Sequence, residues 1–195
     1  MSSEGINAII NRLRGHINFL MVGTIEARKA HEAVLGAFEL LWKTGVDVNL
    51  VIVGKRGWMV EDLAKRLITH HQRNKHLFWL EGLSDEHLED VYAAGTCLIA
   101  ASYGEGFGLP LIEAARHKLP ILARDIPVFR EIAGNHAHYF ENTRDIEVLF
   151  SAFTDWLNLY KRNQHPRSDG MPWVSWKESS KHLLGKILPA IAEGN

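Results

Sequence analysis

Short apolar runs alternate along the chain with longer segments whose apolar residues recur at helical spacing. Strands that are buried on both faces are apolar throughout rather than alternating. Six runs fit this description and are predicted to be strands: Ile17–Val22, Val48–Val53, Leu77–Leu80, Cys97–Ala101, Pro120–Ala123 and Ala137–Phe140. Strands joined by helical segments are typical of βαβ units, so the pattern predicts an α/β domain with a parallel six-stranded sheet and helices on both faces.

The helical segments carry ordinary start and stop signals. Gly45 follows an apolar stripe and predicts a helix end, Ser84 and Asp85 predict a helix start, and Pro110 is tolerated in the first turn of a helix beginning near Leu109. Outside the sheet, the predictions are a short helix that serves as a linker or interdomain connection in residues 1–16, a helix in 146–160, a loop in 163–170 and a terminal helix in 175–191. One domain, including the C-terminal helices, is assigned to residues 17–195.

The composition indicates a single hydrophobic core and a small molecule as the binding partner. The chain has 195 residues, 46% of them hydrophobic, and 22 basic against 23 acidic residues give a formal net charge of -1, so no overall field would attract nucleic acid or an anionic membrane. No apolar run approaches the roughly 20 residues of a membrane-spanning helix, and no signal peptide is seen. The only cysteine, Cys97, is predicted to be a buried, inert thiol, and the expected location is the cytoplasm.

Three familiar kinds of site are not indicated. The eleven histidines, including His70-His71 and the pair His136 and His138, come without a matching cysteine or acidic cluster, so no metal site is predicted. The loop after the first strand contains only Gly23 and lacks the Gly-x-Gly-x-x-Gly spacing of NAD-binding proteins. The Walker pattern of phosphate-binding ATPases is also absent.

Right-handed crossovers would place the six strands in the order 3-2-1-4-5-6, a doubly wound, Rossmann-like sheet. Ligands of such sheets bind beyond the carboxyl ends of strands one and four, where residues 23–29 and 102–108 form loops. Gly104, Gly106 and Gly108 precede a helix whose unpaired amides and positive end would hold a phosphate. Glycines before a helix also serve tight turns, and both interpretations stay open.

Four charged residues belong to the same edge of the predicted sheet. Glu105 lies in the second loop and Glu113 about one turn into the helix, so both can face one crevice and accept hydrogen bonds from sugar hydroxyls. Arg28 and Lys29 follow the first strand, where a cation could neutralise a diphosphate as it leaves. Taken alone, the glutamates are more simply interpreted as a solvated loop residue and a first-turn acid, and the cations as a solvated pair.

From Phe19 to about Leu188 the chain resembles the carboxyl-terminal domain of the GT4 family of retaining glycosyltransferases, the glycosyl transferases group 1, which have the GT-B fold. The matching segments are Phe19–Lys29, Leu50–Gly54, Leu80–Leu88 and Glu105–Ala114. The last segment is the most specific, because it carries the family's two glutamates separated by seven residues, Glu105 and Glu113. The resemblance implies one half of a GT-B fold and a domain that binds a nucleotide-sugar.

The resemblance also implies roles for individual residues. Glu105 and Lys29 would be catalytic: Glu105 would contact the hydroxyls of the donor sugar, and Lys29 would meet the phosphates. Glu113 would hold the ribose. The remaining donor-binding positions would be the phosphate-binding residues Gly106, Phe107, Gly108 and Leu109, the first-loop residues Gly23, Thr24 and Arg28, and Leu83 and Ser84 beside the nucleobase. The donor would be a GDP-, UDP-, ADP- or dTDP-sugar, and transfer would retain the anomeric configuration with no cofactor and no obligatory metal.

The chain departs from the family pattern at four positions. Thr24 replaces a common phosphate-binding arginine, so either Arg28 supplies that charge or Lys29 acts alone; Ala101 replaces a common proline, Lys118 a common glycine, and Gly104 precedes Glu105. The family's amino-terminal, acceptor-binding domain is missing, so we expect the isolated domain to be inactive and the parent protein to reach the inner face of the membrane through that domain.

The resulting interpretation is the donor-binding domain of a hexosyltransferase. The parent enzyme would move a hexose, mannose or glucose, to a saccharide or lipid-linked acceptor of a bacterial surface glycan. A sugar-nucleotide epimerase or a phosphorylase of the GT-B fold is the alternative among enzymes, and the glutamate pair argues against both. A non-catalytic nucleotide-sugar-binding module is the alternative from another class.

Overall fold

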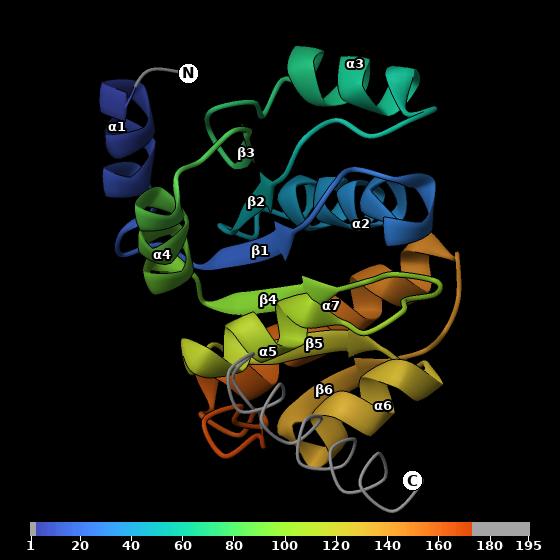
Figure 1. Cartoon of the computed structure of the whole chain (residues 1–195). Coiled ribbons are helices and arrows are strands. Elements are labelled where there is room, and N and C mark those ends of the chain that lie inside the picture. Colours follow the sequence, from blue (N-terminus) through green and yellow to red (C-terminus); the bar gives the residue numbers. More distant parts are fainter. Residues whose placement is uncertain (1–2, 173–195) are drawn as a thin grey trace, which may run out of the picture.

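The computed structural model describes residues 3–172, and its centre is one parallel sheet of six strands (Figure 1). The strand order is β3-β2-β1-β4-β5-β6, which confirms the predicted doubly wound sheet. Each strand lies within one residue of its predicted bounds: β1 (Asn18–Val22), β2 (Asn49–Val53), β3 (Leu77–Leu80), β4 (Cys97–Ala100), β5 (Ile121–Arg124) and β6 (Ala137–Phe140). The differences fall at strand ends because hydrogen-bonded pairing, rather than apolar character, sets those ends.

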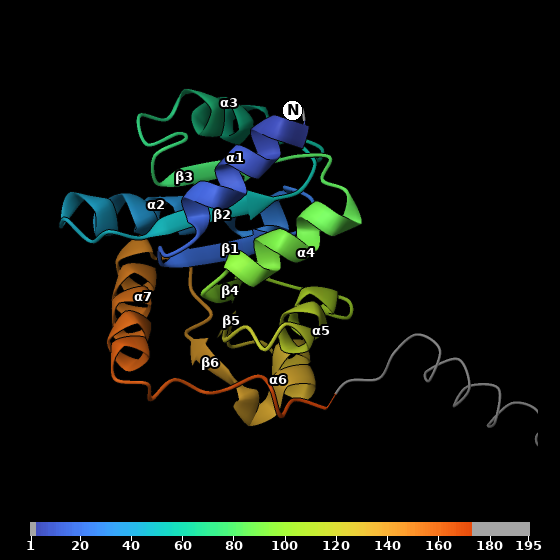
Figure 2. The same ribbon diagram turned by 90° about the vertical axis from the view of Figure 1, so that its left-hand side faces the viewer.

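Helices cover both faces of the sheet, as predicted (Figure 2). One face packs against α2 (His31–Lys43), α3 (Glu61–Thr69) and α7 (Ile146–Lys161). The other face packs against α1 (Ser3–Leu13), α4 (Asp85–Ala94), α5 (Leu109–Arg116) and α6 (Pro127–Ala133). Two short 3₁₀ helices, η1 (Ala27–Lys29) and η2 (Gly134–His136), complete the described elements. None of the described helices is long and apolar enough to cross a membrane.

The predicted helix signals are confirmed where the structure describes them. The hydroxyl of Ser84 accepts a hydrogen bond from the backbone N–H of His87 at 3.3 Å and so caps α4. Gly45, just past the end of α2, has a left-handed backbone with φ 81°, which is the usual way to end a helix. Helix α5 begins at Leu109. The predicted terminal helix, residues 175–191, lies outside the described residues.

The predicted N-terminal helix is present and packs onto the sheet domain. Ile6, Ile10 and Leu13 are at most 5% exposed and join the core beneath α4. Helix α1 lies beside α4 in Figure 2. Cys97 is fully buried, as predicted, and burial raises the pKa of its thiol well above the usual value. Lys118, at the family's common glycine position, has a left-handed backbone with φ 55°, which explains why a glycine suits that position.

A buried asparagine fastens the amino ends of the central strands. Asn18 is 0% exposed at the start of β1, and its side-chain amide donates to the carbonyls of Leu13 and Ala94, both at 2.7 Å. Its Oδ1 accepts a hydrogen bond from Asn49 Nδ2 of β2 at 2.8 Å. One side chain therefore joins the end of α1, the end of α4 and two strands.

We expect Asn18→Leu to lower the free energy of unfolding by about 3 kcal/mol, because the change keeps the shape but leaves several buried polar groups without a partner. Urea denaturation measures the loss. Asn158→Leu, on the exposed side of α7, is the matched control and should change stability by less than about 0.5 kcal/mol. Equal stabilities of the two variants would contradict the role given to Asn18.

Candidate functional site

A cleft opens at the carboxyl end of the sheet, where the strand order reverses. β1 and β4 are neighbours only through the pairs Phe19–Cys97 and Leu20–Leu98. Beyond these pairs the two connections diverge: the segment after β1 leads to α2 on one face of the sheet, and the segment after β4 leads to α5 on the other face. Such a divergence creates a binding crevice in doubly wound sheets. The cleft has a volume of ≈ 480 Å³ and is lined by Val22, Gly23, Arg28, Lys29, Glu105, Gly106, Phe107, Gly108, Leu109, Pro110 and Glu113. We call it the switch-point cleft.

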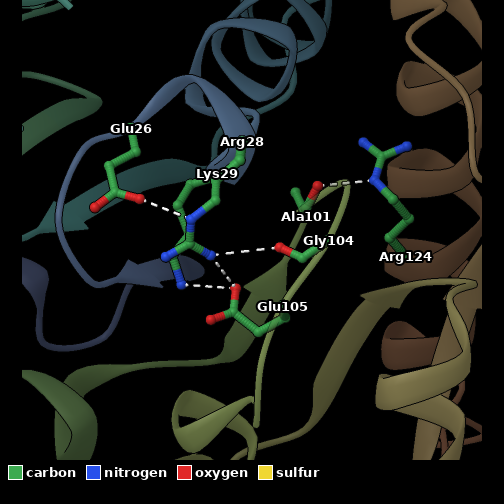
Figure 3. Close-up of polar contacts among 7 residues, drawn as sticks. All are labelled: Glu26, Arg28, Lys29, Ala101, Gly104, Glu105 and Arg124. Carbon is green, nitrogen blue, oxygen red and sulfur yellow. Dashed lines mark hydrogen bonds and ion pairs between the residues drawn. The ribbon is translucent and has the colours of Figure 1, made fainter. Parts of the chain in front are cut away.

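Two cations from the first loop meet one carboxylate from the second (Figure 3). Glu105 Oε2 accepts hydrogen bonds from Lys29 Nζ and from Arg28 Nη1, each at 2.9 Å. Arg28 Nε also pairs with Glu26 Oε2 at 2.8 Å, so its guanidinium lies between two carboxylates. The side chains of Lys29 and Glu105 are 14% and 12% exposed, whereas that of Arg28 is 48% exposed. The inner pair is sheltered and the outer arginine is accessible.

The environment of Glu105 keeps it ionised. Burial by itself raises the pKa of this carboxyl, but hydrogen bonds from Lys29 and Ser102 and the charges of Lys29 and Arg28 outweigh burial, so the pKa lies below its usual value. Glu105 is therefore a carboxylate throughout the neutral range. It balances two adjacent cations that would otherwise repel each other.

The glycine-rich loop leaves its backbone accessible. A Cβ added to Gly104 or Gly106 would meet nothing within 4 Å, so the space before both residues is open. Gly108, directly before α5, has a left-handed backbone with φ 71°, and a Cβ there would crowd Ile132 Cδ1 at 3.1 Å. Among the described residues, the backbone N–H groups of Phe107 and Gly108 donate to no other backbone group. A loop of this kind before a helix can receive an anion.

The second glutamate is held by a buried tyrosine. The hydroxyl of Tyr92, on α4, donates to Glu113 Oε2 at 2.7 Å. Burial and then the charge of Glu113 raise the pKa of Tyr92, so its hydroxyl remains a donor. The ring of Tyr92 stacks on His117 with centroids 4.6 Å apart. Sequence reasoning did not find Tyr92, because a single tyrosine in an amphipathic helix carries no distinguishing signal.

The structure brings most of the predicted site residues together, but not all. Glu105, Glu113, the cations and the glycine loop share the switch-point cleft. Thr24 is exposed and does not line the cleft, although it follows Gly23 directly. Leu83 and Ser84 also lie outside its lining; the next residue, Asp85, lines an adjoining hollow that shares Glu113 with the cleft. The roles implied for these residues stay predictions.

A buried arginine supports the second loop from behind. Arg124, at the end of β5, is 0% exposed, and its Nε donates to the carbonyl of Ala101 at 2.8 Å (Figure 3). Its Nη1 donates to the carbonyl of Thr143, and its guanidinium lies over the ring of Tyr103 at 4.4 Å. Burial lowers the pKa of Arg124, while Tyr103 acts in the opposite direction. The side chain joins the loops after β4 and β6, and within residues 3–172 it forms no ion pair with a carboxylate and its Nη2 has no hydrogen-bond partner.

A buried histidine begins α2 beside the first loop. His31 is 2% exposed, and its Nδ1 has no hydrogen-bond partner within residues 3–172. Burial lowers its pKa to about 4; a hydrogen bond with the backbone of Glu26 acts the other way, and the charge of Lys29 lowers it further. The imidazole is therefore neutral at neutral pH.

Metal ligands do not gather in the described part of the chain: residues 3–172 contain no group of three or more His, Cys, Asp or Glu side chains that could hold a metal ion. The expectation that no metal is required stays a prediction.

Comparison with known proteins decides the family. The sequence profile described as "Glycosyl transferases group 1" matches residues 6–170. The chain belongs to this family.

Two relatives resemble this glycosyl transferases group 1 domain over two thirds of its length or more. The serotype-specific mannosyltransferase WbdA of Escherichia coli is 51% identical over 189 residues, which are 97% of this chain and 23% of that protein. The O-antigen chain mannosyltransferase B of Escherichia coli is 32% identical over 131 residues, covering 67% of this chain and 34% of that protein. The chain thus spans about a quarter to a third of the length of these relatives.

Solved structures support the fold. The C-terminal domain of LpcC, a glycosyl transferase group 1 family protein of Francisella tularensis, matches with a TM-score of 0.67 at 19% identity, over 82% of this chain and 84% of that chain. The catalytic domain of starch synthase IV of Arabidopsis thaliana, bound to ADP and acarbose, matches with a TM-score of 0.75 at 15% identity, over 97% of this chain and 42% of that chain. The domain is therefore one half of a GT-B fold, as predicted.

The buried histidine predicts a pH dependence of stability. The unfolded chain takes up a proton at this side chain below pH 6.5, whereas the folded chain does so only near pH 4. The His31 contribution is complete above pH 6.5 and is lost as the pH falls to about 4, by about 3 kcal/mol in total. Urea denaturation from pH 7 to 4 should show a shallower decline for His31→Gln than for the parent. Parallel profiles would show that His31 is not the titrating group.

Proposed function

We propose that the switch-point cleft binds a nucleotide-sugar and that the chain is the donor-binding half of a retaining hexosyltransferase. One observation carries the proposal: Lys29, Arg28, Glu105, Glu113 and an open glycine loop before α5 share a single cleft in a member of the glycosyl transferases group 1 family. Cations and free amides suit a diphosphate, and carboxylates suit the hydroxyls of two sugars.

The diphosphate would occupy the side of the cleft between the first loop and the start of α5. Lys29 Nζ and the amides of Phe107, Gly108 and Leu109 would bind its oxygens. In the structure, Glu105 occupies the cations that the diphosphate would need. Donor binding would therefore exchange one anion for another at Lys29, which lets Glu105 turn toward the sugar. The 48% exposed Arg28 can follow the phosphate, and it would supply the charge that Thr24 lacks.

The two glutamates would hold the two sugars of the donor. Glu113, oriented by the hydroxyl of Tyr92, would accept hydrogen bonds from the ribose. Glu105 would accept them from the transferred hexose. The nucleobase would lie toward the start of α4, near the backbone of Leu83 and Ser84, because the neighbouring Asp85 shares a hollow with Glu113.

Transfer would break the bond between the anomeric carbon and the phosphate oxygen and form one to an acceptor hydroxyl, with retained configuration. The leaving diphosphate gains negative charge in that step. Once the donor has replaced Glu105 at Lys29, that cation and the amides before α5 would stabilise the growing charge. These groups belong to the protein itself, and the proposal needs neither a metal nor another cofactor.

The names of the relatives favour mannose as the sugar and a bacterial surface polysaccharide as the product. Two of the matched relatives are named as mannosyltransferases, one of them for the O-antigen chain. We propose the same class of reaction in the cytoplasm for the parent of this chain, with the second domain of the GT-B fold supplying the acceptor side. Thermal-shift measurements against GDP-, UDP-, ADP- and dTDP-sugars would identify the donor, because a ligand that binds only the folded state raises its melting temperature.

We expect Lys29→Ala to weaken nucleoside diphosphate binding by about 1–3 kcal/mol, the scale of a hydrogen bond to a charged group, and to leave binding of the uncharged nucleoside nearly unchanged. Calorimetry with both ligands measures the difference. Arg28→Ala tests whether that residue replaces the family's arginine: a loss similar to that of Lys29→Ala supports the replacement. Undiminished diphosphate affinity of Lys29→Ala in both low and moderate salt would refute the phosphate assignment.

Substitution of the two glutamates should separate ribose binding from sugar binding. Glu113→Gln should weaken both nucleoside diphosphate and nucleotide-sugar, because both contain the ribose. Glu105→Gln should not weaken the nucleoside diphosphate, because it frees Lys29 from its competing anion, but it should reduce the preference for the nucleotide-sugar. Titration of each variant with both ligands decides the matter, with Tyr92→Phe as a companion that should resemble Glu113→Gln in a milder form. Equal losses for the two ligands at Glu105→Gln would exclude its contact with the sugar.

A further inference from the structure

Phe107 is the one phenylalanine of this chain that does not pack in the core. The chain has eight phenylalanines. Seven of them pack on one face of the sheet or the other: Phe19, Phe38, Phe78, Phe129, Phe140, Phe150 and Phe153. Phe107 is 58% exposed and lines the switch-point cleft, where it is the only aromatic side chain among the described lining residues. Single exposed apolar side chains are common on protein surfaces, but one that lines a cleft is placed to meet a ligand.

The two aromatic residues of the second loop have different surroundings. Tyr103 packs against the core, and its ring centroid lies 4.4 Å from the guanidinium of Arg124 and 4.7 Å from that of Arg144. Phe107 forms no ring contact and no cation–π contact within residues 3–172. The ring of Tyr103 is therefore already covered, whereas the ring of Phe107 is available to a ligand.

The glycines on either side of Phe107 differ in the space around them. A Cβ added to Gly108 would lie 3.1 Å from Ile132 Cδ1 and 3.3 Å from Phe129 Cε1, so side chains of α6 fill the space on that side of the loop. A Cβ added to Gly106 would meet nothing within 4 Å. The loop is thus closely packed against α6 at its end, and the phenylalanine side chain lies in the part that opens to the cleft.

The position of Phe107 in the loop places its ring beside the transferred sugar. In the proposed function the backbone amide of Phe107 binds the diphosphate, and Glu105, two residues earlier, accepts hydrogen bonds from the hexose. A hexose carries hydroxyls around its edge and C–H groups on its faces. Lys29, Arg28 and Glu105 are charged and suit the hydroxyls, whereas an aromatic ring suits an apolar face. The cleft therefore contains both kinds of group that a hexose can contact.

We propose that the ring of Phe107 packs against a C–H face of the donor hexose and, together with Glu105, makes the cleft prefer a nucleotide-sugar to a nucleoside diphosphate. The inference rests on the proposed function and assigns the residue that contacts the apolar part of the sugar. Glu105 fixes the hexose through its hydroxyls, and Phe107 shields one of its faces from water. The gain follows from the apolar area buried: about 55 Å² at about 25 cal/mol per Å² corresponds to about tenfold in affinity.

Calorimetry on this chain tests the proposal, with GDP-mannose, UDP-glucose, ADP-glucose and dTDP-glucose as probes, each beside its nucleoside diphosphate. For a pair that binds, the ratio of the two affinities measures what the hexose contributes. Phe107→Ala keeps the backbone amide, so it should lower this ratio about tenfold and change the nucleoside diphosphate affinity by less than about twofold. Phe107→Tyr keeps the ring and should keep the ratio. Ile68→Ala, which removes a 46% exposed apolar side chain of α3 outside the cleft, is the matched control.

Proton NMR of the bound nucleotide-sugar distinguishes direct contact from an indirect effect on the loop. Hexose C–H resonances should move upfield over the face of the aromatic ring, and they should show nuclear Overhauser effects to its protons. Phe107→Leu keeps an apolar side chain but should remove both signals. If the unsubstituted chain binds the nucleotide-sugar and shows neither signal, the ring does not contact the sugar and the inference is wrong.

The same titrations separate this inference from the proposed function. If a nucleotide-sugar binds and Phe107→Ala leaves the affinity ratio unchanged, the assignment of Phe107 is wrong while the donor cleft stands. Equal losses for the nucleotide-sugar and the nucleoside diphosphate would also overturn it, because the ring would then support the phosphate-binding loop. If none of the four pairs binds the unsubstituted chain, the donor assignment itself fails, and the role of Phe107 fails with it.

Discussion

One carboxylate oxygen joins the two loops on which the site depends. β1 and β4 send their chains to opposite faces of the sheet, so the loops beyond them have no sheet pairing to hold them together. Glu105 Oε2 makes that connection through Lys29 and Arg28, and the backbone N–H of Tyr103 adds a hydrogen bond to the carbonyl of Arg28 at 2.8 Å. Adjacent cations need an anion nearby. In the structure that anion is Glu105, and a bound diphosphate would take over the same task.

The site combines a buried support with accessible polar groups. Arg124 joins the loop that leads to Glu105, through the carbonyl of Ala101 and the ring of Tyr103, to the loop after β6, through the carbonyl of Thr143. Asn18 performs the corresponding task at the other end of β1, far from the cleft. Between these two anchors the sheet packs against apolar side chains on both faces. Arg28, whose side chain is 48% exposed, lines the cleft.

The departure from the family pattern at Thr24 has a structural counterpart. Thr24 does not line the cleft, whereas Arg28, four residues later and within η1, reaches Glu105. Arg28 lies within η1 itself, and its guanidinium pairs with two carboxylates, Glu26 and Glu105.

The six strands, their order and the edge at which the cleft lies could all be predicted from the amino-acid pattern. Those features follow from local periodicity, from the right-handed crossover rule and from the position of glycine before a helix, all of which can be read without knowing any distance. The shared cleft of Glu105 and Glu113 was predictable for the same reason. Four side-chain arrangements are visible only in the folded structure: Tyr92 holds Glu113, Glu105 pairs with both cations, His31 is buried with no partner for its Nδ1 within residues 3–172, and Thr24, Leu83 and Ser84 lie outside the cleft lining. These facts depend on how side chains from separate loops and helices meet within a few ångströms, and no periodicity along the chain encodes that.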